Sequence, residues 1–345
     1  MIIQKEKNLK YIFLFFLINI LLYQTSILET RIISYIASLL LVINALFFKY
    51  TLFEILCLIF FFIISLFNKN PKFFLTVLLV FNISRINVEE IQKFIKEYWY
   101  FGIIIFLTII FSARLNIIDT KYFIYSAEVT RNGLGFTNPN TVGIYYFILV
   151  SHYYFYKWEK LKFYEILLIF IGYYYIWIYA LSRTNLIIGL FQTITILILK
   201  KIKILKNSYK FFPIIFYILS LLISFFHTKR LNEFMTFRPI IWKWNLEDNF
   251  NFPNFFFGSL GKQVTYSMDN GLLSIQYYYG IFALLFILLL LYKGFENIEE
   301  KYSKKCGILF LSYLMYSLSE DMLISPNFGI LQIYIMSRAF IKIEK

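Results

Sequence analysis

Histidine and cysteine are scarce in this chain of 345 residues, which contains two of each. Cys57 and Cys306 are far apart, and Cys57 falls inside an apolar run, so the sequence does not predict a disulfide framework. His152 and His227 are too widely spaced to suggest a zinc or haem site. We therefore expect the protein to use neither a cofactor nor a metal ion.

Charged residues are also few, at 16% of the chain, whereas 60% of the residues are hydrophobic and 22% are aromatic. The mean hydropathy is +0.67. So little polar surface could not cover a soluble protein of this length. Helices are expected because lipid leaves no backbone group unpaired, and the alternating pattern of a membrane barrel is not seen in the sequence. The predicted fold class is an all-α integral membrane protein.

Twelve apolar runs have the length of membrane-spanning helices or approach it. Their centres lie in Tyr11–Tyr23, Ile32–Phe48, Leu52–Phe67, Phe73–Ile83, Phe101–Phe111, Thr141–Tyr156, Phe163–Ala180, Asn185–Leu199, Phe211–Phe226, Gly271–Tyr292, Gly307–Leu318 and Phe328–Phe340. The first run lacks a small-residue cleavage site and is interpreted as an uncleaved anchor. Residues 1–345 are thus predicted to form a single polytopic bundle of about 12 transmembrane helices.

The lysines indicate how such a bundle is oriented. With the N-terminus inside, the cytoplasmic segments contain 20 lysines and one arginine, and the external segments contain six of each. This excess follows the positive-inside rule, so both termini are predicted to be cytoplasmic and the protein to lie in the cytoplasmic (inner) membrane. The net charge of +14 is attributed to this topology, and no nucleic-acid partner is expected.

The longest external segment joins the ninth and tenth spans and covers His227–Asn270. Loops of this length commonly contain their own structure and have a function. Pro239, at a first-turn position before Ile240, Ile241 and Trp244, predicts a short interfacial helix at the membrane surface.

A second interfacial helix is expected on the cytoplasmic side, before the fifth span. Ile91, Phe94, Ile95 and Tyr98 would share one of its faces. Asn87 and Glu90 have the spacing of a capping box at its start.

Six of the eight arginines fall in predicted external segments, although the positive-inside rule favours the opposite placement. They are Arg31, Arg114, Arg131, Arg183, Arg230 and Arg238. Guanidinium groups bind phosphate oxygens bidentately, which lysine does not. These arginines predict an anionic ligand at the external surface, such as a lipid-linked pyrophosphate. The alternative is that they reach lipid headgroups or pair with Glu128, Glu233 or Glu247.

Arg183 is the strongest of these candidates, because a tight turn between two spans holds it close to the hydrocarbon. Arg131 opens a segment with two glycines and the helix-start signal Asn138-Pro139-Asn140, which also suits a simple helix entry.

The external carboxylates are candidate general bases, because a sugar hydroxyl needs only one well-placed oxygen to accept its proton. Asp269 and Glu320 are the residues we select for this role. A divalent-cation site is less favoured, since the adjacent acids Glu247-Asp248 and Glu320-Asp321 point apart if they are helical. His227 could also act as a base, but its place at the end of a span favours an interfacial anchor.

From Ser112 onward, several short external segments resemble a Wzy-type polysaccharide polymerase of the O-antigen polymerase and ligase superfamily. They are Gly135–Asn140, Leu181–Thr184, Phe237–Trp242, Phe257–Gly261, Asp269–Leu273 with Tyr279-Gly280, and Tyr316–Glu320.

The resemblance implies an external glycosyltransferase that polymerises lipid-linked oligosaccharide repeat units. The donor would be a glycan on undecaprenyl pyrophosphate, and the acceptor the non-reducing end of another lipid-linked unit. Arg183 and Arg238 would bind the leaving pyrophosphate, and Asp269 or Glu320 would accept the proton. The expected substrate-binding residues are Arg131, Asn138, Asn140, Trp242 and Asn270, with Trp242 and Trp244 against sugar rings. Membrane lipid, a flippase and a chain-length regulator are the other expected partners.

Two alternatives stay open within this picture, with an ion channel or a structural membrane protein as a weaker third. O-antigen ligases are similar in architecture but often have His before Asn, where this chain has Asp269-Asn270. A lipid-linked oligosaccharide flippase should have related halves and ionisable residues inside its spans. The mid-span polar residues here are mostly neutral, as at Asn44 and Gln192.

Overall fold

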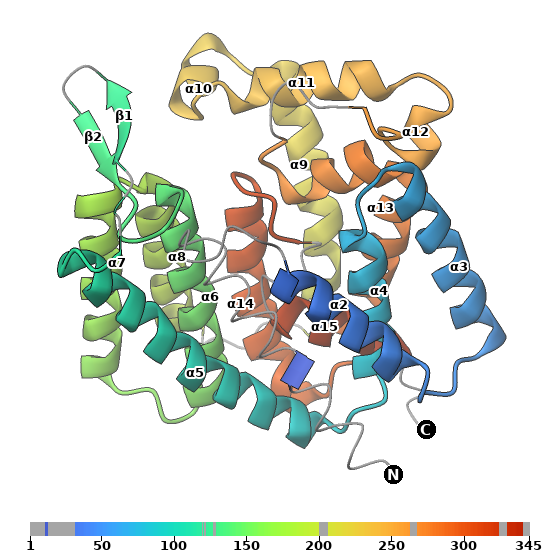
Figure 1. Cartoon of the computed structure of the whole chain (residues 1–345), viewed down its shortest axis with the longest axis horizontal. Coiled ribbons are helices and arrows are strands. Elements are labelled where there is room, and N and C mark those ends of the chain that lie inside the picture. The colour runs from blue at the N-terminus through green and yellow to red at the C-terminus, as the bar shows by residue number, and fades with distance from the viewer. Residues whose placement is uncertain are drawn as a thin grey trace. The chain divides into compact units, whose positions relative to one another are not determined.

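The computed structural model of the chain describes residues 11–12, 32–118, 120, 122–126, 129–199, 206–262, 268–323 and 330–340. These residues are predominantly helical, as predicted, with one short two-stranded hairpin (Figure 1). Most of the first predicted span, together with Arg31 and Glu128, lies outside the described residues.

The chain divides into two compact units that alternate along the sequence. Unit 1 consists of residues 1–47 and 86–202, and unit 2 of residues 48–85 and 203–345.

Unit 1 is built around a helix pair, α5 and α6, which α7 and α8 extend. Its described elements are α2 (Ile32–Ala45), α5 (Val88–Arg114), β1 (Tyr122–Ser126), β2 (Val129–Asn132), α6 (Pro139–Lys157), α7 (Phe163–Ala180) and α8 (Arg183–Leu199). Helices α6 and α8 approach closely at Gly143, where a Cβ atom would lie 2.9 Å from the Cβ atom of Asn185. The strands pair antiparallel, with Phe123 opposite Arg131.

Helix α5 corrects one prediction. The interfacial helix and the fifth span form a single 27-residue helix, because the sequence between Tyr98 and Phe101 contains no helix-breaking residue. The predicted buried face is present, since Ile91, Phe94, Ile95 and Tyr98 are all buried. The predicted capping box is wrong: the Asn87 side chain accepts a hydrogen bond from the amide of Glu89.

Unit 2 surrounds the long helix α13, which packs against several other helices of the unit. Its described elements are α3 (Leu52–Phe67), α4 (Lys72–Ile83), η1 (Lys206–Phe211), α9 (Phe212–Phe226), α10 (Lys229–Phe234), α11 (Arg238–Asn249), α12 (Asn254–Phe257), α13 (Gly271–Asn297), α14 (Glu300–Ser317), α15 (Ile330–Ser337) and η2 (Arg338–Phe340). The described part of the long loop thus contains three helices, α10, α11 and α12. Its predicted helix corresponds to α11, which starts with Pro239 in its first turn and runs across α9 in Figure 1.

Helix α13 starts at the residue predicted for the tenth span but is interrupted at Gly280, where φ is 86° and ψ is 174°. The backbone of the long loop packs directly against α13 at this interruption. A Cβ atom on Gly280 would lie 2.0 Å from the carbonyl oxygen of Phe256, and one on Gly258 would lie 2.2 Å from that of Tyr278. Asn68, at the end of α3, secures the same loop by donating to the carbonyl of Phe257 over 2.8 Å. Its side-chain oxygen accepts from the amide of Leu260 over 2.7 Å.

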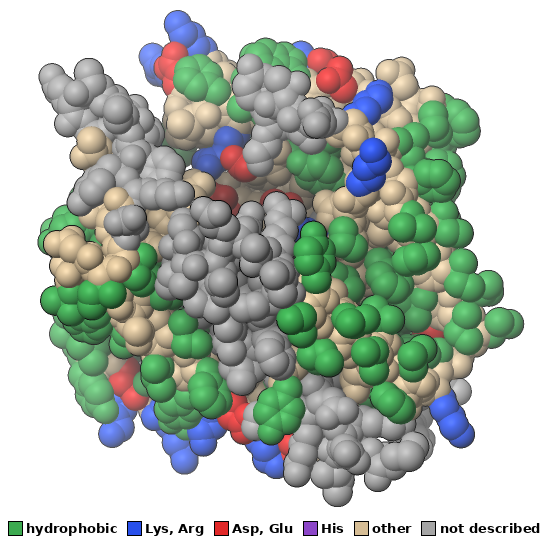
Figure 2. Space-filling view, in the orientation of Figure 1, with side chains coloured by type: hydrophobic (Ala, Val, Ile, Leu, Met, Phe, Trp, Pro, Cys, Tyr) green, Lys and Arg blue, Asp and Glu red, His purple; other side chains and the backbone are tan. Residues whose placement is uncertain are grey.

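Among the described residues, four helices are long and apolar enough to cross a membrane. They cover Val88–Arg114, Phe163–Ala180, Ser208–Phe226 and Gly271–Asn297. The shorter α3 also exposes large apolar side chains, including Leu52, Phe53 and Leu56. Figure 2 shows such hydrophobic side chains over its flank, as expected of a surface that faces lipid. The chain is therefore an all-α membrane protein, and the full count of 12 spans stays a prediction.

The break at Gly280 predicts a specific sensitivity to an added methyl group. We expect Gly280→Ala to lower the free energy of unfolding by several kcal/mol, since its backbone conformation is open almost only to glycine and the Cβ atom would collide with backbone. Gly261→Ala is the control, because Gly261 also has a positive φ but its Cβ atom would meet nothing closer than 3.3 Å. Melting temperatures of the two variants in detergent measure the difference, and equal values would contradict this account of the break.

Candidate functional site

Arg238 lies between two carboxylates at one end of unit 2. Its Nε atom is 3.7 Å from Oδ2 of Asp269, and its Nη2 atom is 3.5 Å from Oε1 of Glu320. The arginine side chain is 18% exposed and that of Glu320 is 15% exposed, whereas that of Asp269 is 36% exposed. Unit 2 thus brings together three of the four catalytic residues predicted from the sequence. The separations are long for charge-assisted hydrogen bonds, so the guanidinium is paired but not tightly held.

Three different helix ends position these side chains. Arg238 is the first residue of α11, Asp269 lies directly before the cap of α13, and Glu320 follows the end of α14. Asn232 holds the start of α11, because its side-chain oxygen accepts from the amide of Ile240 over 3.3 Å. The site is therefore supported by the rigid ends of helices that the long loop and the last turn bring together.

Asp321 adds a carboxylate that the sequence analysis did not select. Its Oδ1 atom accepts a hydrogen bond from the Ser274 hydroxyl over 2.8 Å, on the first turn of α13. Burial raises the pKa of the Asp321 carboxyl above its ordinary value, opposed by the charge of Lys72 and by the Ser274 hydroxyl, and reinforced by the charge of Asp269. Unlike Asp269 and Glu320, Asp321 forms no ion pair with an arginine among the described residues.

Asn270 is fully buried and has a structural role. Its side-chain oxygen caps α13 by accepting from the amides of Leu272 and Leu273, and its amide donates to the Ser220 hydroxyl of α9 over 3.0 Å. It was predicted to bind substrate. The observed contacts instead fix where α13 begins, and with it the position of the neighbouring Asp269.

The two tryptophans of α11 have different environments. Trp242 is completely buried in an apolar cluster with Leu246, Met268 and Leu273, so no ring face is available for the sugar stacking predicted from the sequence. Trp244, by contrast, is 48% exposed. The orientation of α11 against α9 and α13 decides which ring is covered.

Unit 1 carries a second set of predicted residues, at the end where α6 begins and α7 stops. Arg131 donates from Nε to the carbonyl of Ala180 over 2.9 Å, and from Nη2 to Oδ1 of Asn140 over 2.7 Å. Asn138 caps α6 by accepting from the amide of Asn140 over 2.8 Å. These contacts show that Asn138 and Asn140 order the helix entry, the structural alternative weighed from the sequence.

Arg183 is exposed at the start of α8, directly after a turn in which Leu181 adopts a left-handed conformation. Arg183 belongs to unit 1 and Arg238 to unit 2, so their joint action stays a prediction. Asn185, two residues further on, is fully buried, and its amide has no hydrogen-bond partner among the described residues. Asn185 directly follows the Leu181–Thr184 segment but was not predicted as a site residue. The sequence does not show which polar side chains near the start of a helix are buried.

Among the described residues, no group of three or more His, Cys, Asp or Glu side chains is arranged to hold a metal ion. Comparisons of the chain with protein-family models, curated proteins and solved structures find no match. The function proposed for the site therefore rests on the chemistry of its residues.

The Asp321 carboxyl predicts a pH-dependent stability. Because its folded pKa lies above the ordinary value of 3.8, the folded chain binds more protons between the two values, and stability falls as the pH rises through that window. We expect Asp321→Asn to raise the melting temperature at neutral pH and to lose this advantage as the pH falls toward 3.8. Asp248→Asn, at the exposed end of α11, is the control and should have little effect. A lower melting temperature of Asp321→Asn at neutral pH would argue against a destabilising carboxylate.

Proposed function

We propose that the protein is a membrane glycosyltransferase that polymerises lipid-linked oligosaccharide repeat units outside the cytoplasmic membrane, as the Wzy-type resemblance suggests. The observation that carries the proposal is the placement of Arg238 between Asp269 and Glu320, with Asp321 in the next position of the chain. A cation beside several carboxylates suits a reaction that releases an anionic leaving group and takes up a proton.

Arg238 is proposed to stabilise the leaving pyrophosphate. In the transfer, the oxygen of the acceptor hydroxyl attacks the anomeric carbon, and the bond from that carbon to the pyrophosphate oxygen breaks. Negative charge then accumulates on the leaving group, where a guanidinium fork stabilises it without itself losing a proton. The ion-pair distances of 3.5 and 3.7 Å support this role, because a guanidinium exchanges such long contacts for phosphate oxygens at modest cost.

The proton of the acceptor hydroxyl passes to a carboxylate. Asp269 and Glu320 were the candidates from the sequence, but both are occupied as the ion-pair partners of Arg238. Asp321 contacts the Ser274 hydroxyl instead, and its raised pKa suits proton uptake. We therefore propose Asp321 as the base, with Asp269 and Glu320 orienting Arg238.

The proposed topology follows from the sequence: about 12 spans, both termini in the cytoplasm and the Arg238 cluster outside. Two features of the described residues support it. Within unit 1, Arg114, Arg131 and Arg183 lie at one end of the helices, and Lys157 with Glu165 lies at the other. Within unit 2, Lys210 pairs with Glu296 at the end of α13 opposite Asp269.

A lipid-linked oligosaccharide flippase is the second candidate function. The observation that favours it is the interruption of α13 at Gly280, because broken helices commonly form the binding sites of transporters. An O-antigen ligase would use the same site residues with a different acceptor, so product analysis must separate all three activities.

We expect Arg238→Gln to reduce polymerisation in cells by about a hundredfold, the scale of removing one group that stabilises transition-state charge. Asp321→Asn should also abolish long chains, although it is predicted to stabilise the fold. Arg230→Gln, an exposed arginine on α10, is the matched control and should polymerise normally.

The readouts are glycan chain length and export of single units. Short chains with normal export support the polymerase, loss of export supports the flippase, and polymer held on the lipid carrier supports the ligase. Normal chain lengths in Arg238→Gln would refute the assigned role of Arg238.

A further inference from the structure

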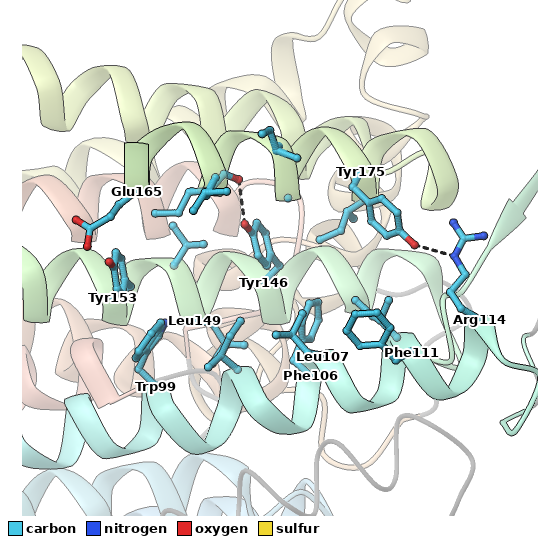
Figure 3. Close-up of a pocket in the computed structure, with 18 residues that line it drawn as sticks. Trp99, Phe106, Leu107, Phe111, Arg114, Tyr146, Leu149, Tyr153, Glu165 and Tyr175 are labelled. Atoms are coloured by element: carbon cyan, nitrogen blue, oxygen red, sulfur yellow. Dashed lines mark hydrogen bonds between the residues drawn. The ribbon is translucent and has the colours of Figure 1, made fainter. Parts of the chain in front are cut away.

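Unit 1 contains an apolar groove that the proposed reaction does not use. Helix α6 packs against both α5 and α7, which do not pack closely against each other, so α6 forms the floor and its neighbours form the walls. The volume between them is about 650 Å³, within the range of pockets that bind small organic molecules. Figure 3 shows the groove between α5, α6 and α7.

The lining is aliphatic and aromatic except at the two ends. Arg114 lies at one end and Glu165 at the other, and they are the only charged residues of the lining (Figure 3). Glu165 lies 3.6 Å from the ammonium of Lys157, which neutralises that end. Among the described residues, the Arg114 end therefore keeps a positive charge without an ion-pair partner.

Arg114 is held in place at the mouth of the groove. Its Nε atom donates to the Tyr175 hydroxyl over 2.7 Å, and its guanidinium carbon lies 3.8 Å from the centre of the Tyr179 ring. It forms no ion pair with any carboxylate of the described residues, and both Nη atoms point away from Tyr175 in Figure 3. Two parallel donors on a fixed guanidinium match the oxygens of a phosphate group.

The groove has the length of a lipid tail. From Trp99 to Arg114, helix α5 rises by about 22 Å at about 1.5 Å per residue. One leaflet contributes about 15 Å of hydrocarbon to a bilayer. A chain that starts from a headgroup at Arg114 could therefore lie in the groove over the whole depth of its leaflet.

We propose that this groove binds one tail of a membrane phospholipid, with the lipid phosphate on Arg114. The groove is lined by residues of unit 1 alone, whereas the Arg238 cluster belongs to unit 2, and the proposal does not depend on the proposed glycosyl transfer. The bound lipid would fill the space between α5 and α7 and stabilise their packing on α6.

Native mass spectrometry of the purified, delipidated chain tests the proposal, with phosphatidylglycerol as the added probe. We expect Arg114→Gln to weaken binding about tenfold or more, because a charge-assisted contact is lost. Leu168→Trp should weaken it similarly, since Leu168 lines the groove and a larger ring would occupy it. Leu167→Trp is the matched control, because Leu167 is the next residue along the helix, is also exposed, and lies outside the lining.

Leu107→Trp, on the opposite wall, replaces Leu168→Trp if that variant does not fold, as judged by its elution and melting temperature. Diacylglycerol, which lacks the phosphate, should bind far more weakly than phosphatidylglycerol. Unchanged binding in Arg114→Gln, or equal binding in Leu168→Trp and Leu167→Trp, would overturn the proposal. Either result would mean that the lipid binds nonspecifically around the protein and not in the groove. Full displacement by inorganic phosphate would overturn it as well, by showing an anion site without a bound tail.

Discussion

One guanidinium group holds together the polar end of unit 2, because it lies between two carboxylates from different segments. Arg238 joins the first residue of α11 to the start of α13 and to the turn after α14. A partly buried cation needs partners, and carboxylates that face it satisfy this requirement at a low local dielectric. Because the three charged groups come from three separate segments, loss of the arginine would remove the positive charge that Asp269 and Glu320 share.

The apolar structure beneath the cluster determines how accurately it is held. Trp242 anchors α11 in the core, and Asn270 joins the start of α13 to α9 through Ser220. The close approach of Phe256 to Gly280 keeps the long loop against α13. Under the proposed function these buried contacts matter to the reaction, because catalytic groups tolerate only small displacements, although none of the contacts would touch a substrate.

Sequence patterns predicted the helices well where the physical signal is local. The bounds of α3 and α7 agree with the predicted runs to the residue. Polar residues flank both ends of α3, whereas α7 ends before Leu181, which adopts a left-handed conformation. The helix that begins near Pro239 was also predicted, from a proline in the first turn.

The sequence analysis did not predict features that depend on contacts between residues far apart in the chain. The break at Gly280 arises from contact with the loop near Phe256, and a single glycine in an apolar run does not reveal it. Trp242 and Trp244 are equivalent in sequence, and only packing against α9 and α13 buries the first. Asp321 was not selected from the sequence, because its hydrogen bond with Ser274 joins residues that are far apart in the chain.

Purified protein in proteoliposomes, supplied with a lipid-linked repeat unit, would test the central claim most directly. The account predicts that longer glycans form as undecaprenyl pyrophosphate is released, in equal numbers of new linkages and released carriers. Intact single units that merely change sides of the bilayer, with no carrier released, would contradict it.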